Sequence, residues 1–164
     1  MKGVISMAFR KKVSLLGFII GAVVDIGGTN IWAIVMAVYV VFSFRLSGLP
    51  PTEIGSRIMQ IFQTDPMIFT VNLLVGSFFS ILGGYLAALI AKHDEILNGG
   101  LSCFLCVLSG IYAIVSGSAS ASILLVLVSL VMDILLGLLG GYLRLLQRSR
   151  GKQALLKAEQ HLAE

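Results

Sequence analysis

Long apolar runs restrict this chain more than any other feature of its sequence. Three runs are long enough to cross about 30 Å of hydrocarbon as single helices, and a fourth crosses once its glycine interruption is included. Of the 164 residues, 57% are hydrophobic and 12% are charged, proportions that are not expected for a water-soluble domain. The sequence therefore predicts an all-α integral membrane protein built as a bundle of four transmembrane helices.

The predicted spans cover residues 12–44, 66–91, 96–115 and 121–146. Together they form a single four-span membrane domain, residues 1–146, which is followed by a cytoplasmic tail, residues 147–164. The first span is one long helix, because its first apolar run extends only about 18 Å at about 1.5 Å per residue and is too short to cross alone. Residues 52–63 predict a short amphipathic helix that either lies in the outer interface or caps the bundle.

The basic residues are distributed unevenly around these spans. Ten of the twelve Lys and Arg residues fall on one side, and only Arg45 and Arg57 fall on the other. This is the positive-inside bias, so we expect both termini in the cytoplasm. It identifies the lipid bilayer as the partner and argues against nucleic acid, and the basic tail is expected to lie on anionic headgroups. The ten residues are Lys2, Arg10, Lys11, Lys12, Lys92, Arg144, Arg148, Arg150, Lys152 and Lys157.

Small residues recur at every fourth position of the predicted helices. In lipid such residues let helix backbones approach closely. One short motif also repeats: Ile81–Leu86 reads ILGGYL and Leu138–Leu143 reads LLGGYL. The repeat predicts two tandem hairpins in the same orientation. The predicted packing residues are Gly17, Gly21, Gly76, Ser80, Gly84, Ala88, Gly137 and Gly141.

The first repeat carries a resemblance to known proteins. The run GGYLAA from Gly83 to Ala88, continued by Lys92 and by Asn98-Gly99, and preceded by the segment Val24–Thr29, resembles small bacterial four-span membrane proteins of unknown function. The resemblance covers roughly the first two thirds of the chain. It implies a four-span topology and a bacterial inner (cytoplasmic) membrane, and it implies no substrate, because that group has no agreed activity.

Two acids, Asp25 and Asp133, are the most informative polar residues. Both lie within predicted spans, about 17 to 20 Å from the cytoplasmic ends of their helices. An isolated acid at this depth costs at least about 2.5 kcal/mol, and no Lys, Arg or His lies at the same depth. Each acid is therefore expected to be protonated, hydrogen-bonded, bound to a cation or hydrated. The candidate polar neighbours are Thr29, Asn30, Asn72 and Ser129.

Two functions follow from these features. In the first, the chain is a non-enzymatic accessory, assembly or scaffold-like membrane component that acts by helix packing. In the second, it is a small proton- or cation-coupled transporter that uses Asp25 and Asp133, together with Asn72. A transporter of four spans is small, so a homodimer or another membrane protein partner is expected. No enzymatic activity, cofactor or metal site is expected.

Cys103 and Cys106 have the spacing of redox motifs, which leaves a membrane thiol redox protein as a third function. The pair lies within a predicted helix toward the cytoplasmic side, where thiols stay reduced. The sequence also lacks a second pair to relay electrons. These features favour small apolar thiols that fill space beside Ser102, Ser109 and Gly110.

Overall fold

All the regular structure in this protein is helical within the residues that a computed structural model describes, 13–116 and 123–163. Four segments are long and apolar enough to cross a membrane: Leu15–Ser43, Pro66–Ala91, Glu95–Tyr112 and Val126–Gly151. The prediction of an all-α four-span bundle is confirmed, and these are the helices of a multi-pass membrane protein. Lys2, Arg10, Lys11 and Lys12 lie outside the described residues.

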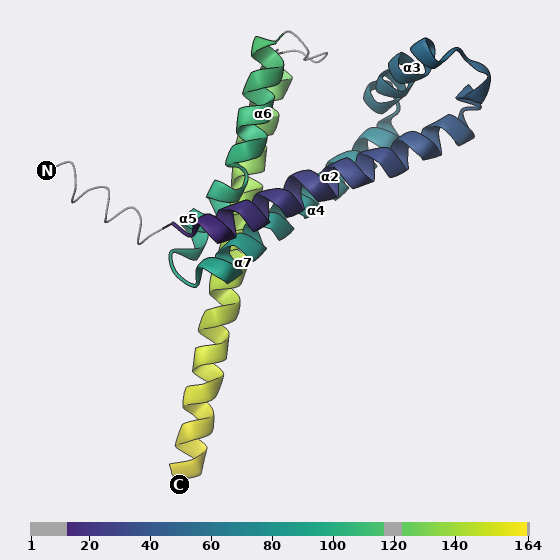
Figure 1. The fold of residues 1–164 in the computed structure, drawn as a ribbon. Coiled ribbons are helices and arrows are strands. Elements are labelled where there is room, and N and C mark those ends of the chain that lie inside the picture. Colours follow the sequence, from purple (N-terminus) through teal and green to yellow (C-terminus); the bar gives the residue numbers. More distant parts are fainter. Residues whose placement is uncertain (1–12, 117–122, 164) are drawn as a thin grey trace, which may run out of the picture.

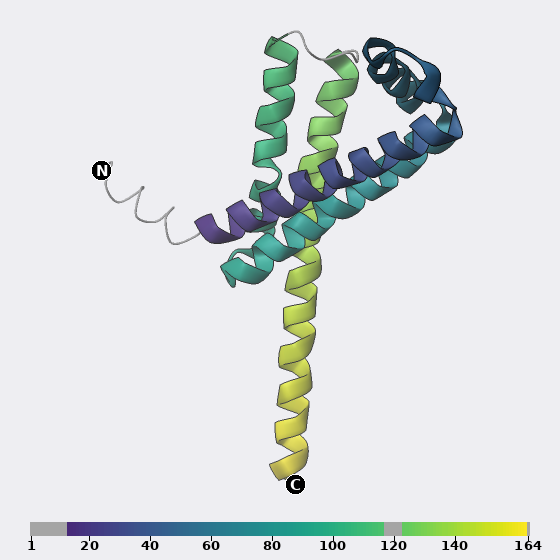
Figure 2. The same cartoon turned by 45° about the vertical axis from the view of Figure 1, so that its right-hand side comes forward.

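The spans pack as two pairs. Helix α2 (Leu15–Ser43) lies along α4 (Pro66–Ala91), and α5 (Glu95–Ser102) and α6 (Phe104–Val115) lie along α7 (Ile123–Ala163). The pairs cross obliquely and diverge toward the end of the molecule that carries α3 (Pro51–Thr64), as Figures 1 and 2 show. Helix α2 continues without interruption through Gly27 and Gly28.

The two repeated motifs meet where α4 crosses α7. A Cβ atom added at Gly84 would overlap the backbone of Gly137, and one added at Gly140 would overlap the carbonyl oxygen of Ile81. The helix backbones therefore touch, which only glycine permits at these positions. The repeat thus supplies both sides of the main contact between the two pairs.

The sequence predicts the third span as one continuous helix, and the structure differs from this prediction. It is divided at Cys103 into α5 and α6. Gly99, Gly100 and Ser102 precede the break and have low helix propensity. The Ser102 hydroxyl also donates a hydrogen bond to the Gly99 carbonyl oxygen at 2.6 Å, which satisfies one of the backbone acceptors at the end of α5.

The predicted tail is helical and continues the fourth span without a break. Residues that follow 146 continue α7, a helix of 41 residues that is about 61 Å long. Figure 1 shows its C-terminal part projecting away from the other helices. The sequence between Gln147 and Gly151 contains no proline to end the helix.

The apolar side of α3 packs against the ends of α2 and α4. Ile58, Ile61 and Phe62 contact a buried cluster of Met36, Val40, Leu46 and Ile68. This contact favours the capping alternative for the amphipathic helix. Asp65 then starts α4, because its Oδ1 atom accepts hydrogen bonds from the backbone N–H groups of Met67 and Ile68 at 2.9 and 3.0 Å.

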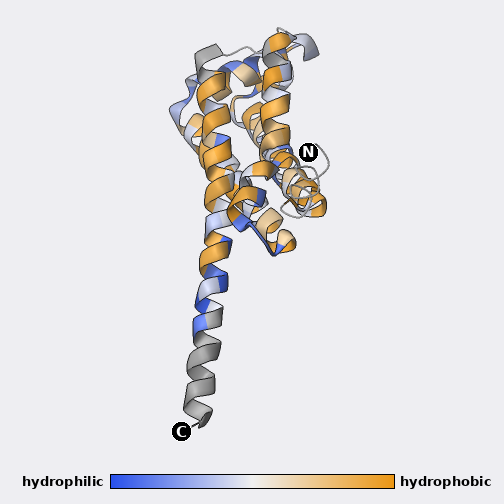
Figure 3. Cartoon of the chain, turned by 90° about the vertical axis from the view of Figure 1, so that its left-hand side faces the viewer, coloured by the Kyte–Doolittle hydropathy of each residue, from blue (hydrophilic) through white to orange (hydrophobic). Residues whose placement is uncertain are grey.

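The outward faces of the spans are apolar. In Figure 3 most of the ribbon of these helices is orange, and blue segments follow along α7 beyond them. Large side chains such as Val23, Ile31 and Ile34 on α2 are more than 60% exposed. Such surfaces are stable in contact with lipid and unstable in contact with water.

The turn between α4 and α5 is fixed by a buried asparagine. Lys92 and Asp94 have positive φ angles of 60° and 43°. The Asn98 side chain is 1% exposed, and its Nδ2 donates to the carbonyl oxygens of His93 and Asp94 at 3.0 and 3.1 Å. Its Oδ1 accepts a hydrogen bond from the Ser14 backbone N–H at 2.8 Å. Asn98 therefore joins the starts of α2 and α5.

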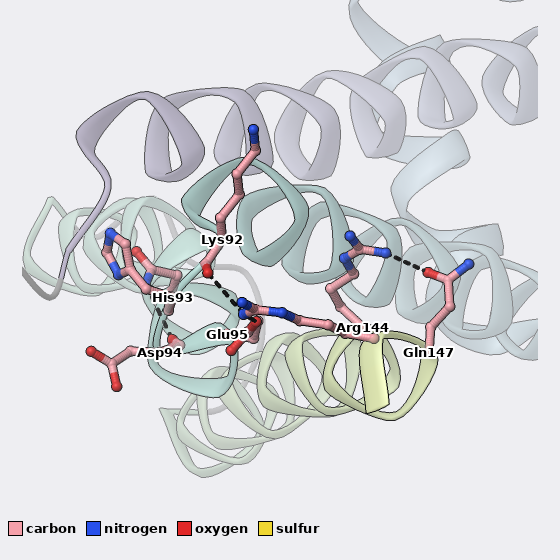
Figure 4. A network of polar contacts seen from close by, with 8 residues as sticks. Lys92, His93, Asp94, Glu95, Arg144 and Gln147 are labelled. Atoms are coloured by element: carbon pink, nitrogen blue, oxygen red, sulfur yellow. Dashed lines mark hydrogen bonds and ion pairs between the residues drawn. The ribbon is translucent and has the colours of Figure 1, made fainter. Parts of the chain in front are cut away.

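An ion pair joins the same turn to α7. Arg148 Nη1 contacts Glu95 Oε1 and also donates to the Lys92 carbonyl oxygen at 2.8 Å. Figure 4 shows this region, with Arg144 donating to Gln147 beside it. Glu95 is only 7% exposed, so its charge depends on Arg148 for compensation.

We expect Arg148→Ala to lower the free energy of unfolding by about 1–3 kcal/mol, because it leaves a buried carboxylate and a backbone carbonyl without their donor. Arg150→Ala is the matched control, since Arg150 is exposed and makes no hydrogen bond or ion pair with the described residues. Thermal unfolding of the purified protein in detergent measures the difference. Equal midpoints for the two variants would contradict this prediction.

Candidate functional site

A cavity of about 390 Å³ lies between the two helix pairs, and all four spans contribute to it. Its polar side chains include two carboxyl groups, hydroxyl groups, an amide and a thiol. No Lys, Arg or His is among the described residues that line it. The lining residues are Asp25, Ile26, Thr29, Asn30, Gly76, Ser80, Cys106, Ser109, Gly110, Val126, Ser129, Leu130 and Asp133.

Asp25 lies at the closed end of the cavity and is 2% exposed. Its Oδ1 accepts a hydrogen bond from Ser80 Oγ at 2.9 Å, and its Oδ2 accepts one from Cys106 Sγ at 3.2 Å. Each carboxyl oxygen therefore has one neutral donor, and the donors come from α4 and α6. Asp25 joins three helices without a positively charged partner among the described residues.

Asp133 lines the same cavity from α7 and is half-buried. No described residue donates a hydrogen bond to its carboxyl group. In a chain that spans lipid, such a carboxyl group requires water, a proton or a cation. The two acids that the sequence places at one depth therefore share one cavity.

Small buried residues close the cavity on the side of the Lys92–Glu95 turn. The helix backbones touch there: a Cβ atom at Gly21 would lie 2.7 Å from the Gly83 carbonyl oxygen, and one at Gly83 would lie 2.6 Å from that of Gly21. We call these residues the packed layer. It consists of Gly21, Ala22, Gly83, Gly84, Ser102, Cys103 and Gly137, all of them buried.

The opposite end of the cavity is open. Thr29, Asn30, Ser109 and Ser129 line it and are exposed. Along their helices, Thr29 and Asn30 lie on the α3 side of Asp25, and Ser129 lies on that side of Asp133. Exposed polar groups at this depth are stable where they line a space that holds water. The cavity therefore has a closed end at the packed layer and an open end toward α3.

Most of the predicted packing residues lie in close contacts. A Cβ atom at Gly17 would lie 2.6 Å from the Ala87 carbonyl oxygen, and one at Gly141 would lie 2.5 Å from that of Glu95. Ala88 is fully buried. Gly76 differs from the expectation, because a Cβ atom there would meet nothing within 4 Å. It lines the cavity because the helix pairs have already diverged at its level.

The predicted polar neighbours separate into two groups. Thr29, Asn30 and Ser129 line the cavity, but none of them is a hydrogen-bond partner of Asp25. Asn72 does not line the cavity, and its Oδ1 accepts a hydrogen bond from Trp32 Nε1 at 2.9 Å. Asn72 therefore links α4 to α2, which corrects its expected place beside the acids.

The contact between Cys106 and Asp25 was not predicted from the sequence. The predicted roles were a space-filling cysteine and, for Ser80, helix packing. Cys106, Ser109 and Gly110 do share one helix face, which was the available signal. Helical spacing within α6 cannot show that this face points toward α2.

Comparison with known proteins gives no relative. No family model, curated protein or solved structure matches this chain. Function is therefore inferred from the cavity and its side chains.

The chemistry available in the cavity is the binding of positive charge. Two carboxyl groups that face one space repel each other when both are ionised, and a proton or a cation relieves this repulsion. The described residues contain no group of three His, Cys, Asp or Glu side chains that converge on a metal ion. Among the lining residues, no histidine is present to activate Ser80, Ser109 or Ser129 as a nucleophile.

Proposed function

We propose that this protein is a non-enzymatic, small proton- or cation-coupled transporter whose site contains Asp25 and Asp133. One observation carries the proposal: both carboxyl groups line one cavity in which the described residues place no basic side chain. Structural acids inside a membrane are normally paired or fully bonded to neighbours. Asp133 lacks such a partner among the described residues, so helix packing does not account for it.

We further infer a location in a bacterial inner membrane, with α3 on the outer side. Lys92, Arg144 and Arg148 lie near the turn that follows α4, while Arg57 lies within α3 and Arg45 lies shortly before it. This distribution supports cytoplasmic placement of the Lys92–Glu95 turn and of both ends of the chain. The open end of the cavity then faces outward, and a second copy or a membrane protein partner would complete the transport path.

The second candidate is an accessory or scaffold-like component that acts by helix packing. The glycine contacts support it, since they fix the helices at very short separations. These glycine contacts, however, join helices of the same chain. The two candidates differ in what they require of Asp133, because an amide of the same size preserves packing and cannot exchange a proton.

Proton flux in liposomes tests the proposal. The full chain is reconstituted into vesicles that contain a pH-sensitive dye and an acidic interior, and Na⁺, K⁺ or n-butylguanidinium is added outside. We expect at least one of these cations to drive proton release, and we expect Asp133→Asn and Asp25→Asn each to slow it about tenfold or more. Glu53→Gln, an exposed acid of α3, is the matched control and should leave the flux unchanged.

Two results would overturn the transporter proposal. One is a wild-type chain that is inserted and folded and yet gives no flux with any of the three cations. The other is an undiminished flux in both aspartate variants.

A further inference from the structure

Three uncharged polar groups of the cavity donate hydrogen bonds within their own helices. Ser109 Oγ and Ser129 Oγ donate their protons to the carbonyl oxygens of Cys106 and Val126, each at 2.8 Å. Asn30 Nδ2 donates to the Ile26 carbonyl oxygen at 2.7 Å. The oxygen atoms of Ser109, Ser129 and Asn30 therefore remain as acceptors. The second N–H of Asn30 and the hydroxyl of Thr29, which also lines the cavity, have no acceptor among the described residues.

The remaining donors at the closed end are also occupied. Ser80 and Cys106 both donate to Asp25, and ionised carboxyl groups only accept. When its carboxyl groups are ionised, the cavity therefore offers negative charge, and its acceptor atoms outnumber the donors that Thr29 and Asn30 present. Its complement is a ligand that carries positive charge and several N–H donors.

The size and walls of the cavity suit a ligand that is larger than a bare metal ion. A volume of about 390 Å³ falls within the range of roughly 300–1,000 Å³ that is common for pockets that bind small organic ligands. Ile26, Val126 and Leu130 contribute apolar side chains to its lining, and Gly76 leaves open space beside its Cα atom. This combination of a few fixed polar groups with apolar walls is typical of sites for small organic ligands.

We propose that the cavity binds a small organic cation with N–H donors, a protonated amine or a guanidinium, that carries a short apolar body. Its charged group lies between Asp25 and Asp133, and its body lies along Ile26 and Leu130. It enters from the α3 end, because the packed layer closes the other end. This inference rests on the cation site of the proposed function and names its substrate class.

Calorimetric titration of the purified full chain tests the proposal, with n-butylguanidinium as the probe. We expect saturable binding that a large excess of Na⁺ does not displace. Tetraethylammonium has the same charge and no N–H donor. It should therefore bind at least about tenfold more weakly than n-butylguanidinium. Asp133→Asn should weaken n-butylguanidinium binding about tenfold or more, because it removes one charge of the pair.

A matched pair of glycine variants tests the role of the open space. Gly76 and Gly27 both have nothing within 4 Å of an added Cβ atom, but only Gly76 lines the cavity. Gly76→Leu should fill the cavity and weaken n-butylguanidinium binding about tenfold or more, whereas Gly27→Leu should leave it unchanged. Both carboxyl groups remain in each variant.

The labelling rate of Cys106 provides a second test of binding. It uses a Cys103→Ser variant, in which every residue that lines the cavity is unchanged. In the Cys103→Ser variant, a methanethiosulfonate reagent that carries a trimethylammonium group should label Cys106 faster than its sulfonate analogue. Saturating n-butylguanidinium should slow this labelling several-fold. These expectations use no transport step, so they hold or fail independently of proton coupling.

Three outcomes would overturn the substrate class. They are the absence of saturable n-butylguanidinium binding to the wild-type chain, equal binding by the Gly76→Leu variant, and displacement by Na⁺ at equal concentration. In the last case proton flux driven by Na⁺ would persist, and the proposed function would stand with a bare ion as its substrate. If n-butylguanidinium binds and no cation drives proton flux, the proposed ligand class is correct and the proposed transport function is wrong.

Discussion

Gly84→Ala is expected to destabilise the protein by about 1–3 kcal/mol, the cost of inserting a methyl group into a closely packed contact. The new Cβ atom would overlap the backbone of Gly137, so α4 and α7 must move apart. Backbone atoms cannot adjust as a flexible side chain can. The packing that is lost is the contact between the two helix pairs, where the repeated motifs meet.

Gly76→Ala is the matched control for this prediction. It lies on the same helix two turns earlier, and its added methyl group meets nothing within 4 Å. Because alanine favours the helix over glycine by about 1 kcal/mol, this variant should be as stable as the wild type or slightly more stable. Unfolding in detergent, followed by circular dichroism, measures both variants. Equal stability of the two would mean that α4 and α7 do not touch at Gly84.

Asn98→Ala is expected to lower the free energy of unfolding by about 3 kcal/mol or more, from three hydrogen bonds at about 1 kcal/mol each. The bonds join Asn98 to Ser14, His93 and Asp94. Their loss removes the side-chain partner of partly buried backbone groups of Ser14 and His93. It also releases a turn in which Lys92 and Asp94 hold positive φ angles.

Asn30→Ala provides the comparison for Asn98→Ala. Asn30 is exposed and bonds to the Ile26 carbonyl oxygen of its own helix. Its replacement should change stability by less than about 0.5 kcal/mol. A loss of similar size in both variants would show that asparagine at position 98 has no special structural role.

The sequence predicted the features that depend on the solvent and on local spacing. Apolar length sets the four spans, and Asp65 and Pro66 set the start of α4. Counting residues from the helix ends placed Asp25 and Asp133 at one depth, and both line one cavity. Depth follows from the rise per residue, so a single sequence is sufficient for it.

Features that depend on helix rotation and on contacts between distant segments were not predictable. Asn72 faces Trp32 and not the acids, although it lies on the same small-residue stripe as Gly76. The Cys106–Asp25 contact joins residues that are 81 positions apart, and no local pattern records it. The break at Cys103 was missed for another reason, because three residues of weak helix propensity are tolerated within many helices.

The continuity of α7 has a mechanical consequence. A straight α-helix is a stiff rod, and this one carries Asp133 near one end and extends to Ala163 at the other. A small change in tilt at the level of Asp133 becomes a larger displacement at the far end, since displacement grows with distance from the pivot. A fluorophore attached near the end of α7 would therefore detect motions around the cavity that are too small to observe at the cavity itself.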